Sequence, residues 1–586
     1  MKLASLIASL LLLASFAQAK DRYLVLFKSE QGYQAMETYF ARAESGAGMQ
    51  KALPHVQGIV LQSDNAALIN RLKSHPEVAV VEKETFTPVP KPVNGFKISR
   101  VDIKEKRRKK RRFTKPQAPQ TVEQVVQVPD FKAGDATPWG ILAVNAGDAW
   151  SDSGAGVNSR VLVLDTGVDE DHPALSENFE KGKNFVAGTD GRVDETDYTD
   201  RDGHGTHCAG TVLGVYNERT GFTGVAPKAK LLAGRVCGEQ GCSNIAVAEG
   251  INWGIEENVD VISMSLGGPG GSAMQRQAVE NADRQGISVV AASGNGAAEQ
   301  NYSPDKTNPK CGAGGFFSPN LCGVSFPAAF PTVVAVGALK SDLERADFSQ
   351  WGPELDITAP GAAVLSSIPV GSGRDSVVEI EVNDSNKDAA VKRRIKSAGF
   401  SGTELFQTPI FKTLVAIPGM GRTTDYEGLD VEGKLVLISR GEITFAEKVK
   451  NAITAKAAGV LIYNNAPGLI QGSLGEDGTL LNIPVVMIEQ ADGVALAEGL
   501  QGGATVWTAV SLVPADYAQF DGTSMATPHV AGVVALMKSA NKKLTPAQVR
   551  SILSETARPL SPNDTNQFGA GLVQADIAVR KALLAQ

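Results

Sequence analysis

Short apolar runs recur along the chain after the first quarter, and stretches with a helical period separate them. Strands that alternate with helices predict an α/β fold of three layers, in which helices cover both faces of a parallel sheet. In such a fold the functional residues gather at the carboxyl ends of the strands. The apolar runs that predict strands are 161–164, 231–236, 259–264, 287–292 and 333–336.

The first part of the chain has its own hydrophobic pattern, which predicts a small α+β unit over residues 20–88. Three apolar runs predict strands and two amphipathic stretches predict helices, which would cover one face of the sheet. The unit is expected to fold independently. The predicted strands are 23–27, 58–61 and 78–81, and the predicted helices are 31–43 and 66–72.

An apolar, uncharged run over residues 3–17 follows Lys2 at the N-terminus. It is shorter than the ~20 residues that a membrane-spanning helix needs, and we expect no integral membrane segment. The run ends in Ala17-Gln18-Ala19, a cleavage site of the A-x-A kind. We therefore predict a signal peptide over residues 1–19 and a secreted protein, extracellular or periplasmic. The alternative is a buried N-terminal helix of a cytoplasmic protein.

The composition is that of a globular protein. Of 586 residues, 42% are hydrophobic and 21% are charged, and 57 Lys and Arg stand against 64 Asp and Glu, a net charge of −7. These values exclude a disordered or fibrous chain. At roughly 100–200 residues per domain, the length predicts about three to five domains.

Positive charge is concentrated in residues 104–115, which hold nine basic residues and one acidic residue, a net charge of +8. Neither a helical nor a strand period crosses this basic run, so we predict an exposed linker over residues 89–130. We favour a maturation segment that trypsin-like proteases cut, and a plain solvated linker is the alternative. A contact with nucleic acid or anionic lipid is disfavoured in an exported chain. The flanking prolines are Pro88, Pro90, Pro92, Pro116 and Pro119.

The five cysteines are too few to form a disulfide scaffold in a chain of this length. The spacing of Cys237 with Cys242, and of Cys311 with Cys322, predicts two local disulfides that close loops. Cys208 would then remain unpaired.

Three polar stretches carry the candidate chemistry. Asp165 directly follows the predicted strand 161–164, where a buried carboxylate needs a partner. His204 lies in a glycine-rich stretch where a helix is predicted to begin. Ser524 lies at a predicted loop-to-helix junction, where backbone N–H groups are free and the positive end of the helix dipole points outward.

These residue types together point to nucleophilic catalysis. A serine hydroxyl becomes reactive when a base removes its proton, and His204 can act as that base near neutral pH. The Asp165 carboxylate would orient the imidazole and stabilise its charged form. The helix terminus would offer an N–H to a developing oxyanion, with the side chain of Asn295 as the second donor. The alternative assigns these residues to strand-end, helix-start, N-cap and turn positions without catalytic roles.

The three stretches, in the order Asp, His, Ser, resemble the subtilisin-like serine peptidases, the subtilase family. Two long motifs carry the resemblance: His-Gly-Thr-His-Cys-Ala-Gly at 204–210 and Gly-Thr-Ser-Met-Ala-Thr-Pro-His-Val-Ala-Gly at 522–532. Shorter matches lie at 224–227, 263–268 and 359–361. The resemblance implies that Asp165, His204 and Ser524 form the catalytic triad and that Asn295 completes the oxyanion hole.

The resemblance also implies a substrate cleft. Ser265, Leu266 and Gly267 look like the edge segment that pairs with the substrate backbone as an added strand. Residues 324–327 resemble the floor of the primary specificity pocket. Because Ser325 on this floor is small and uncharged, we expect no requirement for Arg or Lys in the substrate.

Two further features follow from the same resemblance. The Cys208 position is similar to the proteinase K-like branch, where an unpaired thiol lies beneath the catalytic histidine; the alternative is a small buried residue without a role. The loop between Cys237 and Cys242 aligns with the rim of the cleft upstream of the scissile bond, so a disulfide there would stiffen this rim.

The metal content stays unknown at this point. The family requires no cofactor for its chemistry but often carries structural calcium. Ala174 stands where many members have an aspartate ligand, and the loop 216–224 does not match the usual binding loop, which puts the strong site in doubt. The carboxylate-rich residues 194–202 could hold another hard cation or form a solvated acidic loop.

Two accessory regions complete the resemblance. Residues 20–88 resemble the inhibitory propeptide of subtilases, an intramolecular inhibitor that templates folding and blocks the cleft until it is cut. The mature chain would begin between residues 113 and 137. Residues 374–514 resemble the protease-associated (PA) domain, inserted between two parts of the catalytic domain at 131–373 and 515–586. The insertion would influence substrate access or partner binding, or be inert.

We therefore expect a secreted serine endopeptidase that hydrolyses proteins or peptides through an acyl-enzyme and is made as an autoinhibited precursor. One alternative is a non-catalytic binding protein that keeps the fold as a recognition platform, although the presence of all four candidate catalytic residues argues against it. Another is an esterase that uses the same nucleophile on small acyl substrates.

Overall fold

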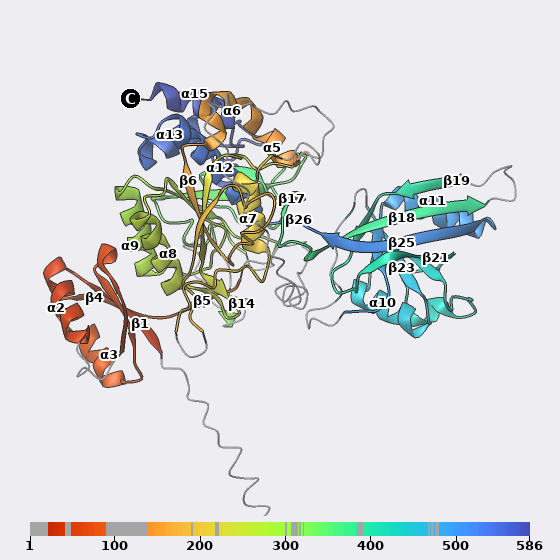
Figure 1. Ribbon diagram of the computed structural model, residues 1–586, viewed down its shortest axis with the longest axis horizontal. Helices are drawn as coiled ribbons and strands as arrows, with labels where there is room; N and C mark the ends of the chain where they lie inside the picture. The colour runs from red at the N-terminus through yellow and green to blue at the C-terminus, as the bar shows by residue number, and fades with distance from the viewer. Residues whose placement is uncertain are drawn as a thin grey trace, which may run out of the picture.

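The computed structural model describes residues 21–41, 48–89, 137–188, 192–216, 222–298, 302–305, 314–315, 318–319, 322–383, 391–466, 469, 474 and 480–585. The predicted signal peptide, the basic run and Cys311 lie outside these residues. Figure 1 shows three parts: an N-terminal unit, a central α/β body, and a region rich in strands on the far side of that body.

The central body is built on a sheet whose strands run in the order β16-β15-β12-β11-β6-β8-β7, and every neighbouring pair is parallel. The predicted α/β class is confirmed, and each of the five predicted apolar runs forms a strand of this sheet. The prediction lacked the two outermost strands, β7 and β16. The strands are β6 (Arg160–Asp165), β7 (Phe179–Asn184), β8 (Lys230–Arg235), β11 (Val261–Met264), β12 (Ser288–Ala292), β15 (Val333–Leu339) and β16 (Ile357–Pro360).

Helices cover both faces of the sheet, and the alternation of side chains along β6 shows how. Val161 and Val163 pack into one apolar cluster with α7 and α12, whereas Leu162 and Leu164 pack into another with α8 and α9. The helices are α5 (Trp139–Ala143), α6 (Ala146–Ser153), α7 (His204–Leu213), α8 (Asn244–Glu256), α9 (Ala273–Arg284), α12 (Thr523–Ala540), α13 (Pro546–Thr556), α14 (Thr565–Phe568) and α15 (Ala575–Leu584).

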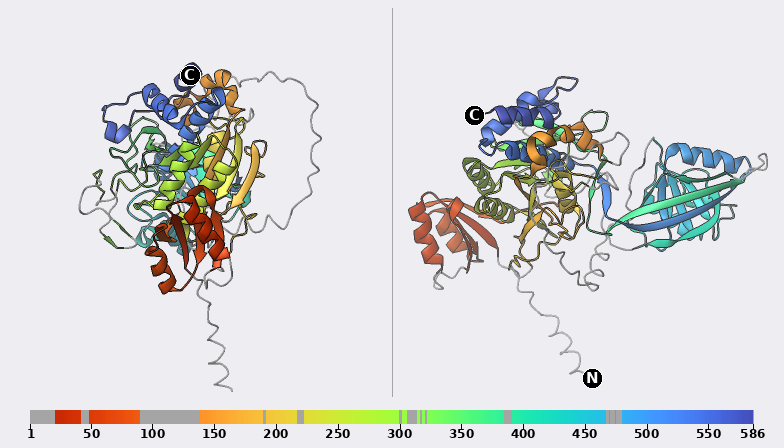
Figure 2. Two further views of the ribbon diagram at one scale, coloured as in Figure 1. Left: turned by 90° about the vertical axis from the view of Figure 1, so that its left-hand side faces the viewer. Right: turned by 45° about the horizontal axis from the view of Figure 1, so that its top comes forward.

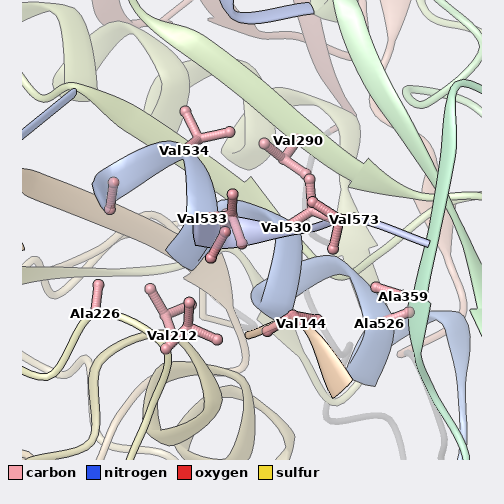
Figure 3. Close-up of a cluster of buried hydrophobic side chains, with 14 of the residues drawn as sticks. Val144, Val212, Ala226, Val290, Ala359, Ala526, Val530, Val533, Val534 and Val573 are labelled. Atoms are coloured by element: carbon pink, nitrogen blue, oxygen red, sulfur yellow. The ribbon is translucent and has the colours of Figure 1, made fainter. Parts of the chain in front are cut away.

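Helix α12 is the centre of the first cluster. Seventeen of its 18 residues, Thr523 through Ser539, are buried, because small and β-branched side chains let α7, α15 and the sheet approach closely. Figure 3 shows Val530, Val533 and Val534 of this helix among valines and alanines from the surrounding elements. Helix α12 is therefore held rigidly at its N-terminal turn, which carries Ser524.

His207 of α7 and His529 of α12 are buried in this core, and each has an exposed fraction of 0%. Burial lowers the pKa of His207 to about 3, with a further contribution from His204, and lowers the pKa of His529 to about 4. The unfolded chain binds protons at these sites from about pH 6.5 downward, while the folded chain stays neutral until these lower values. The free energy of unfolding should therefore fall as the pH decreases from about 6.5 toward 4.

This acid lability can be measured by urea unfolding at pH 7.5, 5.5 and 4.5, in a Ser524→Ala background that prevents self-digestion. The variant His529→Gln should be less stable at pH 7.5 but should lose less free energy of unfolding on acidification than its parent. Equal losses in the two proteins would show that His529 does not contribute.

The N-terminal unit is a four-stranded antiparallel sheet in the order β2-β3-β1-β4, with two helices. All predicted elements are present, but the sheet has one strand more than predicted, because β2 carries a bulge between Met49 and Lys51 that breaks its alternation. The elements are β1 (Arg22–Phe27), α2 (Glu30–Ala41), β2 (Gly48–Leu53), β3 (Gly58–Gln62), α3 (Ala66–Lys73) and β4 (Val78–Lys83), followed by the short strand β5 (Phe86–Thr87).

The third part is a mixed eight-stranded sheet in the order β19-β18-β25-β21-β22-β23-β24-β20. Helices α10 and α11 pack against it in separate apolar clusters. The predicted strand, helix, strand and final strand correspond to β22, α10, β23 and β24. The elements are β18 (Gly373–Asn383), β19 (Val391–Ile395), β20 (Ser397–Gly399), β21 (Phe406–Ala416), β22 (Leu435–Ser439), α10 (Phe445–Thr454), β23 (Gly459–Tyr463), β24 (Val485–Ile488), α11 (Gln490–Gln501) and β25 (Thr505–Ala515).

A two-stranded antiparallel ribbon joins this third part to the central body. Strands β17 (Val364–Ser367) and β26 (Tyr517–Phe520) pair with each other. The chain leaves the body through β17, which is followed within a few residues by β18, and it returns from β25 directly into β26. The Oγ atoms of Ser366 and Ser367 donate to the carbonyls of His207 and Thr206 in α7, at 2.8 and 2.9 Å. The ribbon is thus fastened to α7.

No helix in the described part of the chain is both long and apolar enough to cross a membrane.

Candidate active site

Asp165 and His204 form a buried pair at the carboxyl end of the sheet. Asp165 is the last residue of β6, and His204 is the first residue of α7, after a glycine at φ 96° that allows the chain to turn into the helix. His204 Nδ1 lies 2.7 Å from Asp165 Oδ1, and the two residues are 0% and 1% exposed. Because the carboxylate accepts, Nδ1 carries the proton and Nε2 is free to accept one.

The surroundings of His204 raise the pKa of its imidazole, so that the protonated form is stabilised once the ring has accepted a proton. Burial alone lowers the pKa of the imidazole, but the adjacent Asp165 carboxylate and the Cys208 thiol raise it, so that the net pKa lies well above 6.5. Nε2 of His204 is buried and has no hydrogen-bond partner among the residues that the structure describes. An acceptor of this kind is what a serine nucleophile needs.

Ser524 is the second residue of α12 and is 4% exposed. Its Oγ donates to the carbonyl of Ser265 at 2.9 Å, and Ser265 Oγ donates back to the Ser524 carbonyl at 2.8 Å. The hydroxyl thus bonds to the Ser265 carbonyl and not to His204. A rotation about χ1 would redirect it, and catalytic hydrogen bonds often tighten only when a substrate is bound.

The thiol of Cys208 links the base to the nucleophile. Its Sγ lies 3.8 Å from His204 Nδ1 and donates to the Ser524 carbonyl at 3.5 Å. Two residues 320 positions apart in the chain thus lie against one sulfur atom, which shows that α7 and α12 bring His204 and Ser524 together. Cys208 is buried and free, as predicted, and burial raises its pKa.

A thiol in this position makes the site sensitive to soft metals. We expect a mercurial such as p-chloromercuribenzoate to lower peptidase activity, because a bulky group on Sγ would displace His204 and the Ser524 backbone. The variant Cys208→Ala should keep activity in the presence of the reagent. Full activity after stoichiometric modification of Cys208 would dismiss the expectation.

Asn295 lies beside the N-terminus of α12. Its Oδ1 accepts from both the N–H and the hydroxyl of Thr523, at 2.9 Å each, and the Thr523 hydroxyl in turn accepts from the N–H of Gly294 at 3.1 Å. With its carbonyl oxygen fixed in this way, the amide nitrogen is the free end of the side chain. The nitrogen lies next to the first turn of α12, where the orphan N–H groups of a helix point outward.

The residues predicted to line the cleft gather around this centre. Ser265 contacts Ser524 directly, and Leu266 and Gly267 continue from it, with Gly267 packed against Ser325. Ser325 Oγ donates to Gln350 Oε1 at 3.3 Å. The structure therefore brings together the residues predicted from the motifs.

Gln350 and Asp200 support the site. Gln350 was not singled out from the sequence, and Asp200 was considered only as one carboxylate of a possible cation site. Gln350 is buried behind Asn295, where its backbone N–H donates to Gly294 and its side chain donates to Gly323 at 2.7 Å. Asp200 accepts five hydrogen bonds, which tie the loop after β6 to the start of α7. No local pattern marks Gln350, and none marks Asp200 as a support of the active site. The donors to Asp200 are Thr166 Oγ1, Asp202 N, Gly203 N, Thr206 N and Thr206 Oγ1.

The carboxylates predicted as a second hard-cation site have partners within the protein. Asp200 is saturated as described, Asp194 Oδ1 accepts from the N–H and hydroxyl of Thr196, and Asp197 pairs with Arg201 at 2.7 Å. Among the described residues, the group that could offer three ligands to a metal ion is Asp165, His204 and Cys208. These are the atoms of the candidate active site itself, and they are already bonded to one another.

A disulfide joins Cys237 and Cys242, as predicted. It closes a tight hairpin between strands β9 (Cys237–Gly238) and β10 (Gly241–Ser243) just before α8. Cys322 is also disulfide-bonded, and its predicted partner, Cys311, lies outside the described residues.

A parallel α/β sheet that places a serine at a helix N-terminus beside a buried histidine–carboxylate pair has the arrangement of a serine hydrolase. Comparison with known proteins narrows this class. The sequence pattern of the subtilase family matches residues 156–403 and 491–571, and that of the PA domain matches residues 410–496. The chain belongs to the subtilase family, carries a PA domain inserted in the subtilase region, and is a serine endopeptidase.

Individual relatives agree with this assignment. The chain is 37% identical to the major intracellular serine protease of Bacillus subtilis over 42% of its own length and 70% of that protein. It is 31% identical to subtilisin E of Bacillus subtilis over 61% of its length and 76% of that protein. The crystal structure of the psychrophilic subtilisin-like protease Apa1 from Pseudoalteromonas sp. AS-11 is 26% identical, with a TM-score of 0.52, covering 76% of this chain and 99% of that one.

Proposed function

We propose that this protein is a secreted endopeptidase that hydrolyses proteins or peptides through an acyl-enzyme on Ser524. His204 Nε2 takes the hydroxyl proton and later delivers it to the leaving amine, while Asp165 holds the imidazole. Asn295 and the N–H of Ser524 bind the oxyanion. The observation that carries this proposal is the buried 2.7 Å pair of His204 and Asp165, linked through Cys208 to Ser524.

The specificity pocket suggests which side chains the enzyme accepts. Its floor holds Ser325, whose hydroxyl is engaged by Gln350, and no carboxylate lies among these contacts. We expect peptides with Phe or Leu before the scissile bond to be cut at least about as fast as matched peptides with Lys or Arg. A library of chromogenic tetrapeptides measures this ratio, and strict selection of Lys or Arg would contradict the assignment of the pocket.

We propose further that residues 20–88 act as a covalently attached inhibitor. Apolar residues of this unit, including Leu24, Leu53 and Val56, belong to the same buried cluster as α8 and α9. Lys51 pairs with Glu249 of α8 at 2.8 Å. This interface supports an intramolecular partner, and the view on the right of Figure 2 shows the unit seated against these helices.

The carboxylate of Glu82 adds a directional contact to this interface. Its oxygens accept from the hydroxyl of Ser272 and the backbone N–H of Ala273 at the start of α9, at 2.7 and 2.8 Å. An anion at a helix N-terminus satisfies orphan N–H groups and interacts favourably with the helix dipole. The contact fixes the end of β4 against the start of α9, and residues 83–89 continue from there along the central body.

The remaining assignments are proposals based on the sequence pattern. They comprise export through a signal peptide at 1–19, a linker at 89–130, a catalytic domain at 131–373 and 515–586, and a PA insertion at 374–514. We propose that chemistry needs no cofactor, and that the PA insertion influences substrate access or partner binding.

The proposed function is tested by expressing the precursor, purifying the processed form and measuring two properties together. The processed form should label covalently with a fluorophosphonate at Ser524, located by peptide mass mapping, and should digest casein. Hydrolysis of p-nitrophenyl acetate without digestion of casein would favour the esterase alternative. Absence of both activities would favour a binding platform.

A further inference from the structure

The segment after the N-terminal unit follows the central body toward Ser524. Glu82 accepts a hydrogen bond from the N–H of Ala273. Five residues later Thr87 packs against Gly268, so closely that a methyl group added to this glycine would lie 2.5 Å from Cγ2 of Thr87. Residue numbers rise from 82 to 87 along the first segment while they fall from 273 to 268 along the facing one, so the two segments run antiparallel. At about 3.3 Å per residue, Val89 reaches the level of Leu266, which is the neighbour of Ser265, whose carbonyl accepts from Ser524.

We call residues 85–89 the strap. It is bounded on one side by β10 and the start of α8, and on the other by residues 265–268, which we call the serine wall. Strand β5 of the strap pairs antiparallel with β10, with Thr87 opposite Cys242 and Phe86 opposite Ser243. A substrate held as an added strand between two such edges would bond to both.

The direction of each backbone amide in the strap follows from one fixed residue. Thr85 faces α8, because its N–H donates to Asn244 Oδ1 at 2.9 Å and its carbonyl accepts from Asn244 N at 3.0 Å. In an extended chain this direction alternates with a period of two. Thr87 therefore faces β10, and the amide positions of residues 86 and 88 face the serine wall.

One of these two positions cannot donate a hydrogen bond. Residue 88 is proline, and so is residue 90, directly after the strap, and proline has no backbone N–H. Consistent with this, the three-stranded sheet of the strap has the order β5-β10-β9, and among the described residues no strand pairing joins the strap to Ser265, Leu266 or Gly267. Gly268 is instead bonded through its N–H and its carbonyl to Phe326, at 2.9 Å each.

We propose that the strap is a bound inhibitor that Ser524 does not cut, because Pro88, which has no N–H, keeps it from bonding to the serine wall. The inference rests on the proposed peptidase function. A peptide that is clamped on one edge only is poorly positioned for attack, and a misplacement of about 1 Å can cost on the order of 100-fold in rate. The first cleavage of the precursor therefore falls beyond Pro92, in the chain that contains the basic run.

The test follows the fragments of the full-length precursor by intact mass over time. In the wild-type protein, the released N-terminal fragment should end after residue 92, with no fragment that ends between residues 86 and 92. The variant Pro88→Ala/Pro90→Ala should yield a new fragment that ends between residues 87 and 91, and Ser524→Ala in the same chain should abolish it. The matched control is Pro116→Ala/Pro119→Ala, which should process like the wild type.

A second measurement keeps the test decisive if the double variant does not fold. Synthetic peptides spanning residues 82–95, with the native prolines or with Ala at positions 88 and 90, are offered to the mature wild-type enzyme. The alanine peptide should be cut between residues 87 and 91 with a kcat/KM roughly tenfold or more above that of the native peptide, the effect of the hydrogen bond restored at residue 88.

Two results would overturn the inference. One is a wild-type fragment that ends between residues 86 and 92, and the other is equal cleavage of the two peptides. Either can occur while the mature enzyme labels at Ser524 and digests casein, in which case the proposed function stands and only the role of the strap is wrong. If the mature enzyme neither labels nor digests casein, the proposed function itself has failed.

Discussion

Replacing Ser524 by Ala lowers casein turnover by on the order of 10⁴-fold or more, the largest loss expected for any single substitution in the chain. The nucleophile, the base and its carboxylate act as one unit, so removal of the nucleophile leaves only binding and the oxyanion donors. The variant should fold normally, because Ser524 Oγ makes a single hydrogen bond, to the Ser265 carbonyl. The rate is measured on purified protein with fluorescent casein.

The control for this experiment is Ser551→Ala, which removes the hydroxyl of an exposed serine on α13 that bonds only to Glu555. This control should keep full activity. If the Ser524→Ala protein retained more than about one hundredth of the wild-type rate, with no contaminating protease, then Ser524 would not be the nucleophile.

Replacing Asp165 by Asn has the second-largest expected effect, a loss of about 10⁴-fold in kcat. An amide at this position can stabilise the wrong tautomer of His204, in which Nε2 carries the proton and cannot accept one from Ser524. In addition, Asp165 is 1% exposed, so water cannot replace the charge that the substitution removes from beside the imidazolium.

The pH dependence of the residual activity separates this explanation from simple misfolding. Activity requires neutral His204, whose pKa is raised by Asp165 despite burial, so wild-type activity should rise with pH as the imidazole loses its proton. Without the carboxylate the pKa falls, and the acid limb of kcat/KM should move to lower pH. The exposed Asp152→Asn serves as control, and an unmoved acid limb in Asp165→Asn would contradict the role of Asp165.

The sequence predicted the inner strands of the sheet well because both faces of these strands are buried. Strand β6 reads as an unbroken apolar run, and its last residue, Asp165, stands out as a charge at the end of that run. Strand β7 has the sequence Phe-Glu-Lys-Gly-Lys-Asn and lies at the edge, where solvent tolerates charge, so no hydrophobic pattern marks it. β7 is therefore recognised by its pairing with β8 and not by its own residues.

The candidate site was predictable to the extent that it depends on local motifs. His204 and Ser524 lie in long motifs at helix starts, but the distance between them depends on the packing of α7 against α12. Asp200 shows the limit most clearly, because it reads as one acidic residue among several and becomes a five-fold acceptor only after the loop folds back.

The PA domain is joined to the body in a way that bears on how such a chain could arise. Strands β17 and β26 pair from Val364 with Phe520 to Ser367 with Tyr517, so the outgoing and returning ends are immediate neighbours. A tight turn across that pair would complete an ordinary hairpin on the body. The PA domain therefore occupies the place of a turn, where an ancestral gene could accept or lose a whole domain without rearranging the fold around it.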